Sequence, residues 1–405
     1  MAKGFIRPPR LRAHEQGEES RRATWLELFF DLLFVVAVAQ LAEKITHGLR
    51  WSAMAAFVAL FVPTWWLWIG TTFYATRFVA DDDVLYRFFT FLQMCGIAGL
   101  AVTVRDGFGT GARGFALSYA AVRVVLVIEH LRAGRHLRDA RPLTSRYARG
   151  FAIAAAIWII SAFVPAPTRF ALWAVGLAID VGTPLLGGRI HSDIAPDDSH
   201  LPERFGQFTL IVLGEGMFAV VVGIDPGHLT LAVTTSAVCA LCIAFSLAWI
   251  YFESLDGSAI HAARAQGHII TYQVWLYTHF PLVVALTGAG VGVEYVVTNP
   301  AGAVLPDNAR WLIGGSVAVA LIATGVIHWT SAPPENRTRD HARTRLRVIA
   351  GGIMLLLTAI GRGTAPVLVV GIIATICAAQ VVIDVLNDGE IPATTNGVNN
   401  TQEGV

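Results

Sequence analysis

Two acids one helical turn apart, Glu27 and Asp31, lie in the apolar segment 24–43. Four-residue spacing places both carboxyl groups on one helix face, and about 20 apolar residues suffice to span a bilayer. An ionised Asp at the centre of a span costs about 2.5–3.5 kcal/mol, so such acids normally face a bundle interior or a wet cavity. The pattern predicts a proton-handling or substrate site. The alternative for Glu27 is a first-turn acid favoured by the helix dipole.

A third candidate for this chemistry is Glu215. It follows Arg204 by eleven residues, so it lies about 16 Å further along a helix, near the predicted membrane midplane. Its neighbours Gly214 and Gly216 allow a second helix or a ligand to approach the backbone. The alternative is a structural acid paired with a buried arginine. Arg123 lies too deep in its own span to reach an interface, and we expect it to pair with Asp31 or Glu215.

Histidines near the predicted spans form the next candidates. His279 lies two residues before Pro281, which frees a backbone carbonyl, and an imidazole there can relay protons. A buried histidine that only satisfies core hydrogen bonds is the alternative. His200 and Glu203 are expected to cap and orient the helix that carries Arg204, as structural or ion-pair residues.

Metal and cofactor chemistry have weaker support. The segment 191–203 holds several histidines and acids, but no H-x-x-x-H or E-x-x-H pattern places two zinc ligands on one helix face, and Pro196 and Pro202 favour a loop. No phosphate-binding loop, dinucleotide fingerprint or serine nucleophile elbow occurs. We therefore expect no metal and no cofactor. Cys239 and Cys242 are interpreted as small packing residues, and Asp83 as a helix N-cap.

The elements that position these residues are predicted to be membrane helices. The chain is 55% hydrophobic and 15% charged, with a mean hydropathy of +0.57, whereas soluble domains carry about 25% charged residues. A net charge of +1 gives no case for nucleic acid, so membrane lipids and a small-molecule or lipid-soluble substrate are the expected partners. Twelve apolar windows can be drawn, roughly at 24–46, 53–75, 84–104, 113–131, 150–166, 168–187, 204–223, 229–252, 269–293, 309–329, 346–361 and 363–386.

This pattern predicts an all-α, polytopic helix bundle. Arginines concentrate in the N-terminal tail and in the segments 132–149 and 337–345, which places both termini in the cytoplasm of a multi-pass inner-membrane protein. The predicted division is a basic tail (1–23), a six-helix half (24–187), a cytoplasmic loop (188–203), a second six-helix half (204–386) and a disordered tail (387–405). Similar helix ends in both halves favour a 6+6 repeat in parallel orientation.

Three motifs carry a family resemblance. LELFFDLLFVVAVAQLA in the first window, HLPERFGQFTLIVLGEG at 200–216 and YTHFPLVVALTGAGVG at 277–292 follow one another in order. Together they resemble the bacterial low-temperature-requirement A (LtrA) family. The resemblance implies a polytopic membrane protein and implies no particular chemistry. LGEG departs from the family's usual LGES, which leaves no hydroxyl after Glu215.

Three function classes follow from these residues. A proton-linked transporter uses mid-membrane carboxylates and a histidine to couple a solute to protons. An intramembrane enzyme on a lipid or isoprenoid-like substrate uses the same acids in a dry pocket ringed by tryptophans and Phe29. In a non-catalytic stress-adaptation protein, the buried charges only fix the helix packing. Whether the chain is an enzyme stays open at this point.

Overall fold

The structure is a computed structural model. It describes residues 7–11, 24–46, 48–79, 83–185, 200–253, 269–299, 304–331 and 337–389.

The described residues form an all-α bundle, as the composition predicts. Each of the twelve predicted windows holds one long helix, and the helices are α1 (Trp25–Thr46), α2 (Trp51–Arg77), α3 (Val84–Val104), α4 (Ala112–His136), α5 (Arg141–Ser161), α6 (Thr168–Leu185), α8 (His200–Gly223), α9 (Leu231–Phe252), α11 (Ile269–Thr298), α12 (Asp307–Ser331), α13 (Arg337–Ile360) and α14 (Pro366–Gly389). Within the described ranges, nine of them are long and apolar enough to cross a membrane; α5, α6 and α13 are not among the nine. The chain is therefore a polytopic helical membrane protein.

Two helices begin about nine residues earlier than the apolar windows indicate, and α8 begins at His200, inside the predicted loop 188–203. The arginine-rich segments around 141–149 and 337–345, expected as loops, form the first turns of α5 and α13. Arginine is a good helix former, and Pro142 occupies a first-turn position where its missing N–H costs nothing. The positive charges therefore lie on helix ends instead of on flexible loops.

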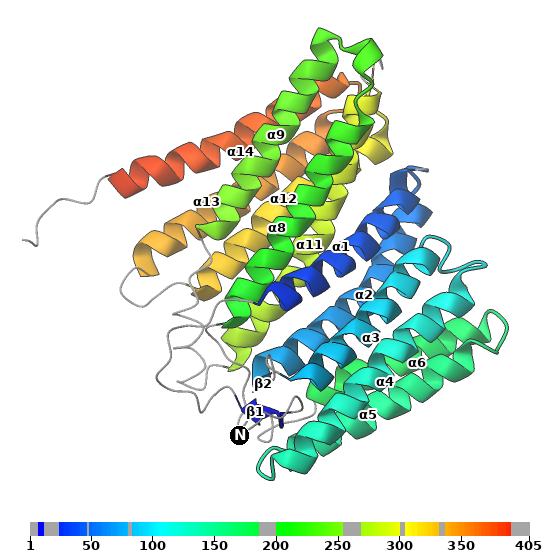
Figure 1. Ribbon diagram of the computed structural model, residues 1–405. Helices are drawn as coiled ribbons and strands as arrows, with labels where there is room; N and C mark the ends of the chain where they lie inside the picture. The colour runs from blue at the N-terminus through cyan, green and yellow to red at the C-terminus, as the bar shows by residue number, and fades with distance from the viewer. Residues whose placement is uncertain are drawn as a thin grey trace, which may run out of the picture.

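The helices pack in two groups, seen in Figure 1 as the blue-to-green and the green-to-red parts of the bundle. In the first group α1 packs on α2 and α3, α4 on α3 and α5, and α6 on α5. In the second, α8 packs on α9 and α11, α12 on α11 and α13, and α14 on α9. The two groups meet where α1 and α2 contact α8 and α11.

Aromatic side chains fill this contact between the two groups. The Trp68 ring of α2 lies 4.9 Å from Phe205 and 4.5 Å from Phe208 of α8, measured between ring centroids. Trp65 packs on the same two rings and on Phe280 of α11. Each aromatic pair adds about 0.5–1.5 kcal/mol beyond its buried area. Trp65 and Trp68 are thus core residues.

The N-terminal segment is tied to the same end of the bundle as the start of α1. Strand β1 (Arg10–Leu11) pairs antiparallel with β2 (Phe78–Val79), which follows α2. Asp83 accepts hydrogen bonds from Leu85 N and Tyr86 N, which confirms the predicted N-cap. It also forms a 2.6 Å ion pair with Arg132 of α4.

Candidate functional site: a buried charge cluster between α1, α2 and α8

The central contact joins α1 to α8. Arg204 Nη2 donates a 2.6 Å hydrogen bond to Asp31 Oδ1, and Trp68 Nε1 of α2 donates a second, of 2.8 Å, to the same oxygen. Asp31 is 0% exposed and Arg204 is 1% exposed. Hydrogen bonds between charged partners are short and roughly twice as strong as neutral ones, so Asp31 is held by two helices outside its own.

Glu27, one turn before Asp31, joins the same cluster. Arg204 Nη1 lies 3.1 Å from Glu27 Oε1, and His200 Nε2 lies 3.3 Å from Glu27 Oε2. Thr24 caps the first turn of α1 by accepting the Glu27 backbone N–H at its Oγ1, at 3.3 Å, and its own backbone N–H donates to Glu27 Oε2 at 2.9 Å. Glu203 lies at the rim, where Oε2 is 3.4 Å from His200 Nδ1. The expected grouping of His200, Glu203 and Arg204 at the start of α8 is therefore present, and its partners are the two acids of α1.

The charges in this cluster do not balance. Two buried carboxyl groups, Glu27 and Asp31, share one buried guanidinium, that of Arg204. His200, also buried, is the neighbouring group that can carry a further positive charge. A low-dielectric site with an excess carboxylate favours uptake of one positive charge. The arrangement can bind a proton or hold the charged group of a ligand.

A polar cavity opens beside the cluster. It measures about 280 Å³ with its open mouth included. Its wall comes from α1, α2, α3 and α8: Leu26, Glu27, Phe30, Thr71, Ala75, Tyr86, Thr90, Gln93 and Arg204. Water can occupy cavities with several polar partners. The cluster therefore has an adjoining space in which protons can exchange.

Arg123 has a different partner from the two predicted for it. Its Nε donates a 2.7 Å hydrogen bond to Asp180 of α6, and its Nη2 donates to the Trp66 carbonyl at 2.9 Å. The Tyr119 hydroxyl also hydrogen-bonds Asp180. The prediction of Asp31 or Glu215 was wrong because Arg204 already occupies Asp31, and because α6 brings a third buried acid to α4.

Glu215 stands apart from the cluster. It is half-buried on α8, and among the described residues no hydrogen-bond or ion-pair partner contacts it. Eleven residues are about three helical turns, so Glu215 lies on the same stripe of α8 as Arg204, about 16 Å further along. The structure does not bring Glu215 to Glu27, Asp31 or Arg123.

The glycines beside Glu215 differ in their surroundings. The helices α8 and α11 cross closely at Gly216, where a Cβ built on Gly290 would lie 3.0 Å from the Gly216 Cα. A Cβ on Gly214 would meet nothing within 4 Å. The close approach expected at these glycines is therefore present at Gly216 alone.

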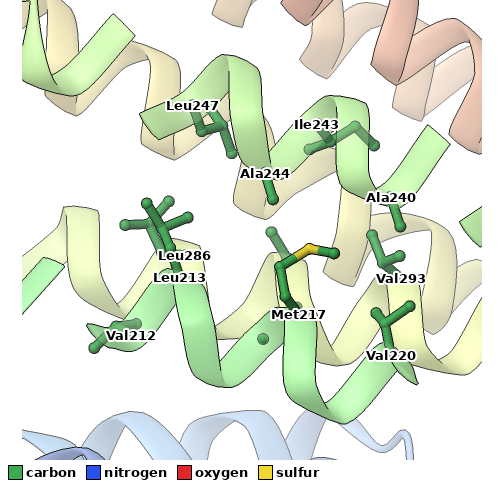
Figure 2. A pocket seen from close by; sticks show the side chains of 13 residues that line it. Val212, Leu213, Met217, Val220, Ala240, Ile243, Ala244, Leu247, Leu286 and Val293 are labelled. Atoms are coloured by element: carbon green, nitrogen blue, oxygen red, sulfur yellow. The ribbon is translucent and has the colours of Figure 1, made fainter. Parts of the chain in front are cut away.

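Next to this crossing, an apolar cavity of about 380 Å³, its open mouth included, lies between α8, α9 and α11. Figure 2 shows Leu213, Met217 and Val220 on its α8 side, facing Ala240 and Ile243 of α9. Glu215 does not line it. The cavity therefore offers hydrocarbon contacts without a charge.

His279 has both ring nitrogens engaged within the core. Its Nδ1 lies 2.8 Å from the Trp275 carbonyl and its Nε2 lies 3.2 Å from the Tyr251 hydroxyl. A carbonyl only accepts, so Nδ1 carries the ring proton and Nε2 accepts from Tyr251. The Phe205 ring packs on the imidazole at 4.6 Å. The arrangement links α9, α11 and α8, and a relay role for His279 stays a prediction.

Several residues of this interior were not singled out from the sequence. Trp68 was considered only as part of an aromatic ring around a pocket, and Phe29, the other expected member, is 53% exposed. Asp180, near the end of the sixth apolar window, is an acid for which the sequence predicts no role. Glu129 lies inside the fourth apolar window, and a charged residue in a span is itself a signal.

The possible metal ligands of 191–199 lie outside the described residues. Within the described ranges, no group of three His, Cys, Asp or Glu side chains is arranged to hold an ion. Cys239 and Cys242 are free thiols on α9, and Cys242 contacts the Ala374 carbonyl of α14. These contacts are those of packing residues.

The fold and its interior define a class: integral membrane proteins of many helices whose core carries buried charged residues. Residues 22–383 match the family described as Bacterial low temperature requirement A protein (LtrA), and the chain belongs to that family. The chain is also 26% identical to "Uncharacterized protein RA0937" of Rhizobium meliloti (strain 1021) over 302 residues, which cover 71% of this chain and 72% of that relative. No solved structure shows significant similarity to the present chain.

Proposed function

We propose that this protein is a proton-linked transporter of the inner membrane, with Glu27, Asp31 and Arg204 as its proton-handling centre. The observation that carries the proposal is that two buried carboxyl groups share one arginine. Such a site holds either an excess negative charge or a proton. Intramembrane acids of this kind are typical of proton relays in pumps and transporters.

Proton binding can be coupled to a rearrangement of the two helix groups because the cluster lies between them. Arg204 belongs to α8, and both acids belong to α1, so their ion pairs cross the contact between the groups. Protonation of Asp31 or Glu27 removes one attraction across that contact. Arg204 keeps its ion pair with the other acid, so the attraction between the two helix groups is weakened and not abolished. The equilibrium between two arrangements of the halves then shifts by the difference that this weaker attraction makes to their free energies.

Glu215 is the second proton-carrying group in this proposal. It shares the α8 stripe with Arg204 and has no protein partner among the described residues. A half-buried carboxyl about 16 Å from the cluster suits a further step toward the opposite side. His279 has a supporting role, because its hydrogen bond to Tyr251 of α9 and its ring contact with Phe205 of α8 orient α11 against these two helices.

A duplicated architecture fits this mechanism. The packing of α1 on α3, α3 on α4 and α4 on α5 corresponds to that of α8 on α11, α11 on α12 and α12 on α13. The last helices differ, since α6 packs on α5 whereas α14 packs mainly on α9. We propose two six-helix halves, 24–187 and 204–386, in the same orientation, with both termini in the cytoplasm and the arginine-rich helix ends beside them.

The test is a flux measurement on purified protein in liposomes. Candidate solutes are screened under an imposed pH gradient, with wild type and Glu215→Gln in parallel. The proposal predicts a solute-dependent proton flux in wild type that is lost in Glu215→Gln, while both proteins reconstitute equally. An equal proton flux in both proteins would remove Glu215 from the path.

One observation favours the enzyme alternative. A larger cavity of about 640 Å³ lies between α2, α5, α6 and α11, and six aromatic rings line it: Trp66, Phe73, Tyr147, Phe151, Tyr272 and Tyr277. Its aromatic lining suits an apolar or isoprenoid-like substrate. Bound lipid that is chemically altered by the protein, without any proton flux, would favour this function. The absence of both would favour the non-catalytic role.

A further inference from the structure

Glu129 of α4 is the exception among the buried acids. The described residues contain six buried carboxyl groups, those of Glu27, Asp31, Asp83, Glu129, Asp180 and Asp384. Five of them form an ion pair with at least one arginine. Within the described ranges no cation forms an ion pair with Glu129. Its one side-chain partner is an uncharged amide: Gln93 Nε2 of α3 donates to Glu129 Oε2 at 2.7 Å.

In the described structure, the groups around Glu129 give its carboxyl group no second hydrogen bond and no ion pair. Its second oxygen, Oε1, is buried without a hydrogen-bond partner in the described structure. The Tyr74 hydroxyl donates to the Glu129 backbone carbonyl instead. Arg132, less than one turn further along α4, is engaged by Asp83 at 2.6 Å. The charge of Arg132, on the same helix, acts on Glu129, and Tyr74 of α2 faces it; Tyr86 and Asp83 surround Tyr74 in turn.

Ionisation of a carboxyl group that is buried without an ion pair costs free energy. Moving an ionised carboxylate into a low-dielectric interior without a counter-ion costs several kcal/mol or more, whereas a neutral carboxylic acid keeps most of its hydrogen bonding. A bound proton supplies the missing positive charge. It also supplies a donor, which an ionised carboxylate lacks.

Gln93 connects Glu129 to the polar cavity of the charge cluster. Its side chain forms part of the wall of the 280 Å³ cavity that Glu27 and Arg204 also line. One amide therefore separates Glu129 from a space shared with the proton-handling centre. We infer that Glu129 is a further, separate proton-binding carboxyl group, that it exchanges its proton with this cavity, and that Gln93 is its positioning residue.

The path from Glu129 through the cavity to Glu27 rests on the proposed transport function, but proton binding by Glu129 does not. The test therefore reads proton binding directly. Infrared difference spectra of the full-length protein in lipid nanodiscs are recorded between high and low pH, in H₂O and in D₂O. A protonated carboxyl gives a C=O stretch above the amide bands that shifts in D₂O.

The expected result is a carboxyl band in wild type that is absent in Glu129→Gln and displaced in Glu129→Asp. Gln93→Leu should move the band to higher frequency, because its hydrogen bond to the carboxyl is lost, a shift that a merely structural role would not produce. Glu43→Gln, which changes a half-exposed acid paired with Arg105, is the control and should leave the band unchanged.

The inference is overturned if Glu129→Gln retains the full wild-type band, or if Gln93→Leu and Glu129→Asp leave its frequency unchanged. The two conservative variants serve as the test if Glu129→Gln fails to fold. A Glu129 band in a protein that moves no protons would support the inference while contradicting the transporter. Proton flux in a protein that lacks the Glu129 band would support the transporter and contradict the inference about Glu129.

Discussion

Arg204 and Asp31 are 173 residues apart in the chain, yet their side chains form a 2.6 Å hydrogen-bonded ion pair in the core. This pair, with Glu27 on the second guanidinium nitrogen, is a buried ionic link between the helix groups that begin with α1 and α8. Its excess of carboxyl groups over arginines distinguishes it from the buried pair of Arg123 and Asp180.

Removing the shared cation should be more damaging than removing the whole cluster. Arg204→Gln leaves two buried acids without the arginine that they share, and we expect a loss of about 3–5 kcal/mol in stability. The triple variant Glu27→Gln, Asp31→Asn, Arg204→Gln should recover more than half of that loss. Thermal unfolding followed by fluorescence-detected size exclusion compares them. Strictly additive losses would contradict this view of the cluster.

The Arg123 and Asp180 pair is expected to be purely structural. Arg123→Leu should destabilise the protein by about 3–5 kcal/mol because Asp180 is left buried and uncompensated. Arg123→Leu with Asp180→Leu should restore expression and stability, and the restored protein should keep its transport. Loss of transport in a stable double variant would instead give this pair a functional role.

The loop between α3 and α4 predicts a pH dependence outside the membrane spans. Hydrogen bonds from the Thr110 hydroxyl and backbone N–H, at 2.7 and 2.5 Å, lower the pKa of Asp106. A lowered folded-state pKa means that the stabilisation is present above the unfolded pKa, about 3.9, and is lost as pH falls through the folded value.

Asp106→Ala should therefore lower the apparent Tm at pH 7 and have a smaller effect below about pH 4. The contribution should stay under about 1 kcal/mol, because the carboxyl group is exposed to water. Melting curves of wild type and Asp106→Ala at several pH values test this. A difference that stays constant down to the lowest pH would show that the charge plays no part.

The membrane fold could be predicted from the sequence because it depends on local properties. Length and hydropathy locate each helix without knowledge of its neighbours. The starts of α5 and α13 were missed because their first turns are arginine-rich: an apolar window detects the lipid-facing part of a helix and not its polar end.

Pairings between helices were harder to predict. The sequence identifies Glu27 and Asp31 as acids inside a span. It also groups His200, Glu203 and Arg204 at the start of the later helix, where the structure pairs two of them with these acids. The partner of Arg123 depends on how α6 returns beside α4, which no spacing along the chain encodes. That Glu129 forms no ion pair among the described residues is likewise known only from the structure, which pairs the other buried acids with arginines.

The most direct test of the central claim compares two acids on α1 in the same liposome assay. Solute-driven proton flux is measured for Asp31→Asn, which alters the cluster, and for Glu43→Gln, near the opposite end of the helix, beside Arg105. We predict that Asp31→Asn abolishes the proton flux and that Glu43→Gln retains the wild-type rate. Wild-type proton flux in Asp31→Asn would contradict the proposal that the acids sharing Arg204 handle the proton.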